Sequence, residues 1–136
     1  MPFYTPPTST YETHREVLLS SMSASTIGSY TIDSDYITPT TAVDGNAYET
    51  VFEGQVLAMN PANGKAVPNY TSYGFGVLGV LWRAVNTDNQ DVPAPVILEG
   101  WVDSNYCTDN GTFGTVLAAT VTALADVVHF VARETL

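Results

Sequence analysis

The side chains that could act in nucleophilic catalysis are a single cysteine, Cys107, and two histidines, His14 and His129. A weak nucleophile becomes reactive only when a base lies within hydrogen-bond reach and a third group orients that base. His14 belongs to a segment rich in Pro, Ser and Thr, whereas His129 lies in an alternating apolar stretch, where a lone histidine is usually packed or half exposed. Cys107 is interpreted as a small buried hydrophobe. The sequence therefore predicts no catalytic residue, and we expect a protein that is not an enzyme.

The sequence also lacks the spacing of a metal site. There is no second cysteine and no pair of histidines four residues apart, which are the usual zinc patterns. The acidic stretches at residues 33–35 ("DSD") and 88–91 ("DNQD") lack the glycine and the terminal glutamate of a calcium loop. We interpret them as solvated loop carboxylates, and we expect neither a metal nor a cofactor.

The stretch "GFGVLG" from Gly74 to Gly79 has the bare glycine spacing of a dinucleotide-binding loop. Such a loop must lie between a strand and a helix, with an acidic residue about 20 positions further on. Here the third glycine is followed by Val-Leu-Trp, which continues a strand. A dinucleotide site is therefore not expected.

Charge narrows the set of partners. The chain of 136 residues has 14 acidic and four basic residues, for a formal charge of -10. Binding to nucleic acid depends mainly on cations that neutralise phosphates, so direct contact with nucleic acid is not expected, and neither is attachment to an anionic membrane. A charged start followed by an apolar stretch is missing, as is any apolar run long enough to span a membrane. We expect a protein that is made in a cytosol-like space.

Most of the chain has the pattern of β-structure. From residue 31 onward, stretches rich in Tyr, Thr, Val and Ile alternate with turn signals every 8 to 12 residues, a spacing typical of an all-β sandwich or barrel. Asp44-Gly45 indicates one tight turn, and "NPANG" from Asn60 to Gly64 predicts a hairpin between residues 55–59 and 65–68. The fold class that follows is mainly β, a small single-domain β-barrel or β-tulip-like fold.

Near the C-terminus, "TVLAATVTALAD" is ambiguous between helix and strand. Leu117, Val121 and Leu124 have helical spacing, although several of their neighbours prefer strands. We favour one short helix there, followed by a final strand in "VVHFVARE".

Residues 1–41 are interpreted as an extended N-terminal arm, and residues 42–136 as the β-rich domain. The arm contains Pro2, Pro6, Pro7 and Pro39 among many Ser and Thr residues. It also carries apolar and aromatic side chains that a simple linker would lack, so we expect it to bind a partner. The alternative is an ordinary edge strand with a flexible terminus. The candidate contact residues in the arm are Phe3, Tyr4, Tyr11, Arg15, Val17, Leu18 and Leu19.

The run "GFGVLGVLW" is interpreted as a central strand with apolar residues on both faces. Glycine between large residues leaves room for a close neighbour or marks a bulge. We expect Trp101, on the following strand, to cover Gly79. The candidates for the core or for a subunit interface are Gly76, Gly79, Trp82 and Trp101.

Four stretches in the same order resemble the head decoration proteins of tailed phages, of the bacteriophage lambda protein D type. They are "GQVLAMNPANGKAVP" (residues 54–68), "GFGVLGVL" (74–81), "PVILEGWV" (95–102) and "DVVHFV" (126–131). The resemblance covers about residues 50 to 131.

This resemblance implies a structural protein that forms a homotrimer on the exterior of the expanded capsid. There it would bind the major capsid protein through its N-terminal segment and reinforce the shell against the pressure of packaged DNA. The expected location is then the virion, after synthesis in the host cytoplasm. The arm is longer and more aromatic than in the shortest members of that family, so its path over the shell, and onto a neighbouring trimer, is left open.

The alternative function is a virion fibre, tail or other surface module that recognises host glycans, with exposed Trp82 and Trp101 as platforms for sugar rings. A small hydrolase would need the cysteine and histidine constellations that the sequence does not supply.

Overall fold

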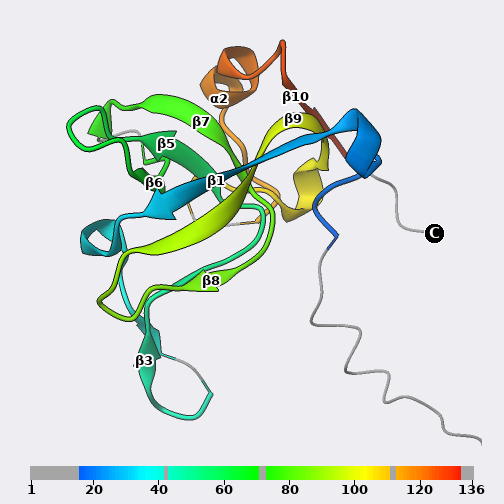
Figure 1. The fold of residues 1–136 in the computed structure, drawn as a ribbon. Coiled ribbons are helices and arrows are strands. Elements are labelled where there is room, and N and C mark those ends of the chain that lie inside the picture. Colours follow the sequence, from blue (N-terminus) through cyan, green and yellow to red (C-terminus); the bar gives the residue numbers. More distant parts are fainter. Residues whose placement is uncertain (1–15, 42, 71–72, 111–112, 133–136) are drawn as a thin grey trace, which may run out of the picture.

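The computed structural model describes residues 16–41, 43–70, 73–110 and 113–132, and it is built mainly from β-strands (Figure 1). The strands are β1 (Thr26–Ile32), β2 (Thr40–Thr41), β3 (Ala47–Tyr48), β4 (Thr50–Val51), β5 (Val56–Met59), β6 (Ala66–Pro68), β7 (Gly76–Leu81), β8 (Val85–Asn86), β9 (Val92–Asp103) and β10 (Val128–Val131). The helical elements are α2 (Ala118–Ala123) and the short 3-10 turns η1 (Met22–Ala24), η2 (Ser34–Tyr36) and η4 (Ser104–Tyr106).

Five of these strands close into a barrel. The order is β1-β6-β5-β7-β9, and β9 pairs again with β1 to complete the ring. Most neighbours are antiparallel, while β1 and β6 meet in parallel at the single pair Ile32 and Ala66. Strand β10 adds to the far half of β9 in parallel, from Val128 opposite Gly100 to Val131 opposite Asp103. The expected mainly-β barrel is confirmed.

The predicted hairpin is formed by β5 and β6, with Met59 opposite Ala66. Its turn is closed by asparagine side chains, since Asn60 Oδ1 accepts the Ala62 N–H at 3.0 Å and Asn63 Oδ1 accepts the Lys65 N–H at 3.0 Å. Gly64 has a positive φ of 72°, a conformation that glycine adopts without steric cost. The sequence signal "NPANG" therefore acts as expected.

Two hydrophobic cores hold the strands. The first fills the barrel, because every barrel strand contributes to it: Ile32, Leu57, Ala66, Leu81, Ala94 and Val96, with Ile37 and Val51. The second lies between the β5-β7-β9 wall and the segments that cover it: Val17, Leu18, Val56, Val80, Ile97, Val102, Cys107, Leu124 and Val128. The ambiguous stretch near the C-terminus contributes Leu124 to this second core just after α2, and so the short helix is confirmed.

The boundary expected at residue 41 is corrected by the packing of residues 17–32. Val17 is fully buried and Leu18 nearly so, and the Leu19 N–H donates to the Trp101 carbonyl at 2.8 Å. Strand β1 then pairs with β9 from Thr26 to Ile32. Residues 17–41 are therefore part of the folded domain, although β1 pairs with both β6 and β9 and is not the edge strand of the alternative. Residues 1–15 lie outside the described residues. Within the described ranges, no helix is long and apolar enough to cross a membrane.

Candidate interaction surfaces

Cys107 is held in the second core. Its side chain is fully buried and its Sγ donates to the Asp103 carbonyl at 3.2 Å. Burial, reinforced by the negative charges of Asp103 and Asp109, raises the pKa of the Cys107 thiol to about 12. The thiol is therefore protonated and shielded at neutral pH, the opposite of what an activated nucleophile needs. The described histidine, His129, stacks on Trp101 with ring centroids 4.7 Å apart.

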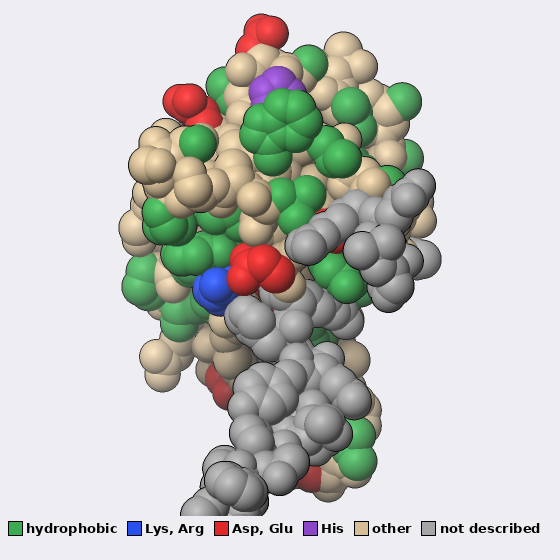
Figure 2. Space-filling view, turned by 90° about the vertical axis from the view of Figure 1, so that its right-hand side faces the viewer, with side chains coloured by type: hydrophobic (Ala, Val, Ile, Leu, Met, Phe, Trp, Pro, Cys, Tyr) green, Lys and Arg blue, Asp and Glu red, His purple; other side chains and the backbone are tan. Residues whose placement is uncertain are grey.

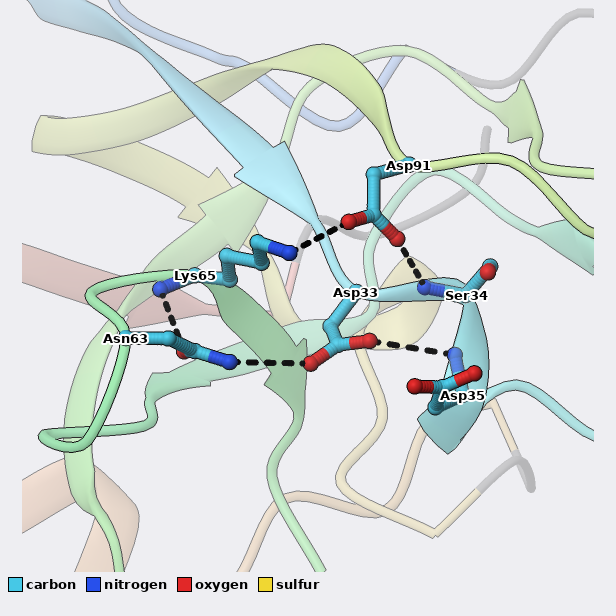
Figure 3. Close-up of polar contacts among 6 residues, drawn as sticks. All are labelled: Asp33, Ser34, Asp35, Asn63, Lys65 and Asp91. Atoms are coloured by element: carbon cyan, nitrogen blue, oxygen red, sulfur yellow. Dashed lines mark hydrogen bonds and ion pairs between the residues drawn. The ribbon is translucent and has the colours of Figure 1, made fainter.

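The acidic stretches that the sequence left as loop carboxylates form a structural cluster (Figure 3). Asp33 is buried, which corrects the expectation that it is solvated, and it accepts from the Asp35 N–H at 3.1 Å and from Asn63 Nδ2 at 3.2 Å. Asp91 accepts the Ser34 N–H at 3.0 Å and forms an ion pair with Lys65. The cluster joins the end of β1, the β5–β6 turn and the start of β9.

The same ion pair explains two pKa shifts. The hydrogen bond from Lys65, followed by the Ser34 N–H, lowers the pKa of Asp91, and Asp91 in turn raises the pKa of Lys65. Both side chains are partly exposed to solvent, so the pair contributes little to stability. Among the described residues, no group of three or more His, Cys, Asp or Glu side chains is arranged to hold a metal ion.

A second polar cluster is centred on the buried side chain of Asp109. Its carboxylate accepts from the Leu117 N–H at 2.7 Å, from Asn69 Nδ2 at 2.8 Å and from Thr120 Oγ1 at 3.0 Å. The Asp109 carbonyl accepts from Gln55 Nε2 at 3.0 Å. Asp109 thereby caps the first turn of α2 from the loop that precedes it, and it ties that helix to the start of β5 and to the end of β6.

Gly79 and Gly76 have different surroundings, although both lie in β7. A Cβ on Gly79 would overlap the Ile97 carbonyl and touch a Val96 methyl group. The neighbour that covers Gly79 is therefore the backbone of β9, and the expectation that Trp101 covers it is wrong. Nothing lies within 4 Å of a Cβ on Gly76, which is at the surface.

The exposed tryptophan lies on what we name the Trp101 face, formed by Trp101, Val127 and His129. Trp101 is 51% exposed and Val127 is 37% exposed. Figure 2 shows a histidine beside a large hydrophobic side chain on the surface of the molecule. Strand β10, which carries His129, pairs only with β9 within the described part of the chain. An apolar surface beside an unpaired strand edge is suited to a protein contact.

Trp82 is half-buried against the second core and is covered from outside by Arg83, whose guanidinium carbon lies 4.3 Å from the ring centroid. Its indole N–H is buried and has no partner among the described residues. Arg83 also lies 3.7 Å from the Glu16 carboxylate. Glu16, at the root of the N-terminal segment, therefore lies beside the end of β7, and Trp82 is not a free sugar platform.

A cleft of about 300 Å³ opens at the end of the barrel where β5 begins and β6 ends. We name it the aromatic cleft after Tyr36, Phe52, Tyr70 and Phe113, which line it. Phe52 and Phe113 meet edge to face, and Tyr36 and Tyr70 each pack against Tyr73. Its residues come from segments between positions 36 and 113, so no local sequence pattern announces it.

The sequence candidates fall into three groups. Val17, Leu18, Gly79 and Trp82 pack within the chain, and Leu19 is half-buried, so Val17 and Leu18 are core residues and not free contact residues. Trp101 and Gly76 are exposed. Phe3, Tyr4, Tyr11 and Arg15 lie outside the described residues.

Comparison with known protein families, with curated proteins and with solved structures finds no match for this chain.

Proposed function

We propose that this protein decorates and stabilises the head of a tailed phage, binding as a homotrimer to the major capsid protein on the outside of the expanded shell. The proposal originates in the four stretches that resemble the lambda protein D type. In the structure these stretches are the β5–β6 hairpin, β7, the second half of β9 and β10. They are neighbours in one sheet. The four stretches therefore form one continuous part of the sheet.

One observation supports the proposal most directly. The root of the N-terminal segment and the exposed Trp101 face adjoin each other, because Leu19 donates its N–H to the Trp101 carbonyl at 2.8 Å and Ser20 Oγ accepts the Trp101 N–H at 3.1 Å. The segment that would bind the capsid and the tryptophan that would contact another subunit thus share one side of the molecule. A trimer built on that face would direct three N-terminal segments toward the same shell.

The function would be mechanical. Burial of apolar area contributes roughly 25 cal/mol per Å², whereas fixing the backbone of one residue costs about 1–2 kcal/mol. For a single extended segment, the free energy gained by apolar burial is therefore close to the free energy lost by ordering its backbone. Attachment through three linked segments raises the effective concentration of each and makes the complex persistent.

Sedimentation with expanded phage heads that lack their decoration protein tests this function. The full-length variant Phe3→Ser/Tyr4→Ser/Tyr11→Ser should lose binding, because it removes the aromatic anchors and leaves the barrel intact. A deletion of residues 1–19 is unsuitable, because it also removes the buried Val17 and Leu18. Heads saturated equally by the variant and the natural chain would contradict the proposal.

The trimer is tested separately by light scattering in solution. A mass of three chains is expected for the natural protein, and a lower mass is expected for Trp101→Ser if the Trp101 face forms the contact. A natural protein that remains monomeric at micromolar concentration would count against the trimer.

A second candidate function, recognition of host glycans, is favoured by the exposure of Trp101 and its stacking on His129. An aromatic platform of this kind can bind the apolar face of a sugar ring. A glycan screen with the natural protein and Trp101→Ser separates this candidate from capsid decoration.

A further inference from the structure

The aromatic cleft has the chemistry of a binding site for an extended peptide. Its base includes the buried side chains of Ile37, Val51 and Pro68, while Phe52 is 45% exposed and Tyr70 is 36% exposed. Its volume of about 300 Å³ is at the lower end of the range of ligand sites, roughly 300–1,000 Å³. An occupant that fits would be narrow and mainly apolar.

Hydroxyl groups along the cleft could donate hydrogen bonds to the carbonyls of a bound peptide. Thr38, Thr40, Thr50 and Tyr70 line the cleft. The Tyr70 hydroxyl and the Thr50 hydroxyl have no hydrogen-bond partner within the described ranges, and so they remain able to donate. A polyproline II segment presents carbonyls that form no internal hydrogen bonds, and grooves lined with aromatic rings are its usual binding partners.

The chain itself contains a segment of this kind. Residues 1–7 read "MPFYTPP", and proline fixes φ near that of polyproline II while restricting the preceding residue to extended conformations. Pro2, Pro6 and Pro7 therefore bias five of the first seven positions toward the bound shape. A segment that is already extended loses little entropy when it docks.

Glu16, where this segment joins the domain, lies near the cleft. Glu16 lies 3.7 Å from Arg83, which follows the end of β7 by two residues. The Leu81 N–H, at that end, donates to the Gln55 carbonyl at 2.9 Å, and Gln55 lines the cleft. With the stretch from Pro2 to Pro7 docked, residues 8–15 form the tether, and these eight residues at about 3.1 Å each span roughly 25 Å. The N-terminal segment is therefore long enough to reach the cleft of its own molecule.

The geometry points to an intramolecular complex in which residues 1–15 fold back and the stretch from Pro2 to Pro7 docks as polyproline II in the aromatic cleft. This complex does not depend on the proposed capsid binding. A short tether gives an effective concentration in the millimolar range, so even a weak contact is populated. Phe3 and Tyr4 would then be held against the protein until a competing surface releases them.

Paramagnetic broadening in the full-length protein tests this complex. A nitroxide is attached to Thr10→Cys, next to the docked stretch, at neutral pH, where the buried Cys107 thiol does not react. If the effective concentration matches a millimolar Kd, about half of the molecules are docked, and the amide signals of Phe52, Gln55 and Tyr70 should be broadened relative to the reduced nitroxide.

Three variants of the labelled chain make the result specific. The changes Pro2→Ala/Pro6→Ala/Pro7→Ala and Tyr70→Ser should each reduce the broadening, while Trp101→Ser, which removes an exposed aromatic ring elsewhere, should leave it unchanged. A preserved amide spectrum shows that each variant is folded. Broadening that survives both the proline changes and Tyr70→Ser would overturn the proposal.

Mixing distinguishes docking within one molecule from docking between two. Nitroxide-labelled protein without ¹⁵N is added to ¹⁵N protein without nitroxide, and no broadening at the cleft is expected. Broadening only in this mixed sample would mean that the segment docks in a second copy. No broadening in either sample would mean that the segment does not bind the cleft, whose ligand would then be a sugar or another protein. Either result rules out the intramolecular complex.

Discussion

Gly79 of β7 lies directly against the carbonyl of Ile97 in β9, so closely that a Cβ at position 79 would overlap that oxygen. The two strands pair at this point, with Val80 opposite Ile97. On its other side β7 pairs with β5, where Leu57 is opposite Gly79 and the register shifts at the next residue. The close contact between β7 and β9 and the register shift between β7 and β5 therefore lie side by side in the barrel wall.

Replacing Gly79 by alanine should destabilise the barrel. The new methyl group meets backbone atoms, which cannot move without disturbing the pairing of β7 with β9, and overpacking of this kind costs about 1–3 kcal/mol. For a domain of this size the melting temperature should fall by several degrees, as circular dichroism on heating would show.

Gly76→Ala is the matched control, because a Cβ there meets nothing within 4 Å and the φ angle is not positive. Its melting temperature should be unchanged or slightly higher, since alanine restricts the unfolded chain more than glycine does. Equal losses in both variants would show that the close contact with Ile97 is not responsible.

The sequence predicts the parts of this fold that depend on local signals. The β5–β6 hairpin follows from the turn around Asn63-Gly64, and α2 lies where Leu117, Val121 and Leu124 have helical spacing. Of these three side chains only Leu124 is buried. Strand β10 follows from the alternation after Asp126. In each case the residues that determine the element lie within a few positions of one another.

Features that depend on distant pairing could not be predicted in the same way. Strand β1 belongs to the domain because it pairs with β9, which lies 60 to 73 residues later at the paired positions, from Ile32 opposite Val92 to Thr26 opposite Glu99. The prolines of residues 1–7 are typical of an extended arm, but no proline lies between residues 17 and 38, where the chain joins the barrel. The partner of Gly79 likewise depends on strand register, which places Ile97, and not Trp101, beside it.

The buried carboxylate of Asp109 should be a larger contributor to stability than any exposed acid. Asp109→Ala leaves the Leu117 N–H, the Asn69 amide and the Thr120 hydroxyl without this acceptor. The Asn69 amide can still donate to Thr120 Oγ1 at 3.2 Å and Leu117 is exposed, so the buried Thr120 hydroxyl is the group left unsatisfied. One unsatisfied buried group costs about 1–3 kcal/mol, and the midpoint of urea unfolding should fall accordingly. Asp126→Ala, which changes an exposed acid beyond α2, should leave the midpoint within experimental error. Similar midpoints for the two variants would contradict the capping role of Asp109.

Cys107 should make the protein less stable at alkaline pH. Burial raises the pKa of its thiol from the ordinary value of 9.0 to about 12 in the folded protein. Above pH 9 the unfolded chain therefore releases a proton that the folded chain retains, and stability falls as the pH rises from about 9 toward 12. One pKa unit corresponds to about 1.4 kcal/mol, so the loss at pH 10 is of that order.

Cys107→Ala isolates this contribution, because the other groups that titrate in the same range are present in both proteins. Unfolding free energies measured by urea between pH 7 and 10.5 should decline more steeply for the natural chain than for the variant. Parallel curves would mean that the thiolate is tolerated in the folded core.

In a series of N-terminal truncations, the melting temperature should drop sharply at the position where the N-terminal segment joins the domain. Removing residues 1–15 leaves in place every core contact made by the described residues, so the melting temperature should be nearly unchanged. Removing residues 1–19 also deletes Val17 and Leu18 from the second core, together with the hydrogen bonds that join Val17 and Leu19 to β9 at 2.8 Å. Loss of a large buried side chain costs about 2–5 kcal/mol, which for two such residues approaches the whole stability of a small domain. The longer deletion should therefore be largely unfolded, and Val17→Ala in the full chain should lie between the two. A longer deletion that melts like the shorter one would show that the domain begins after residue 19.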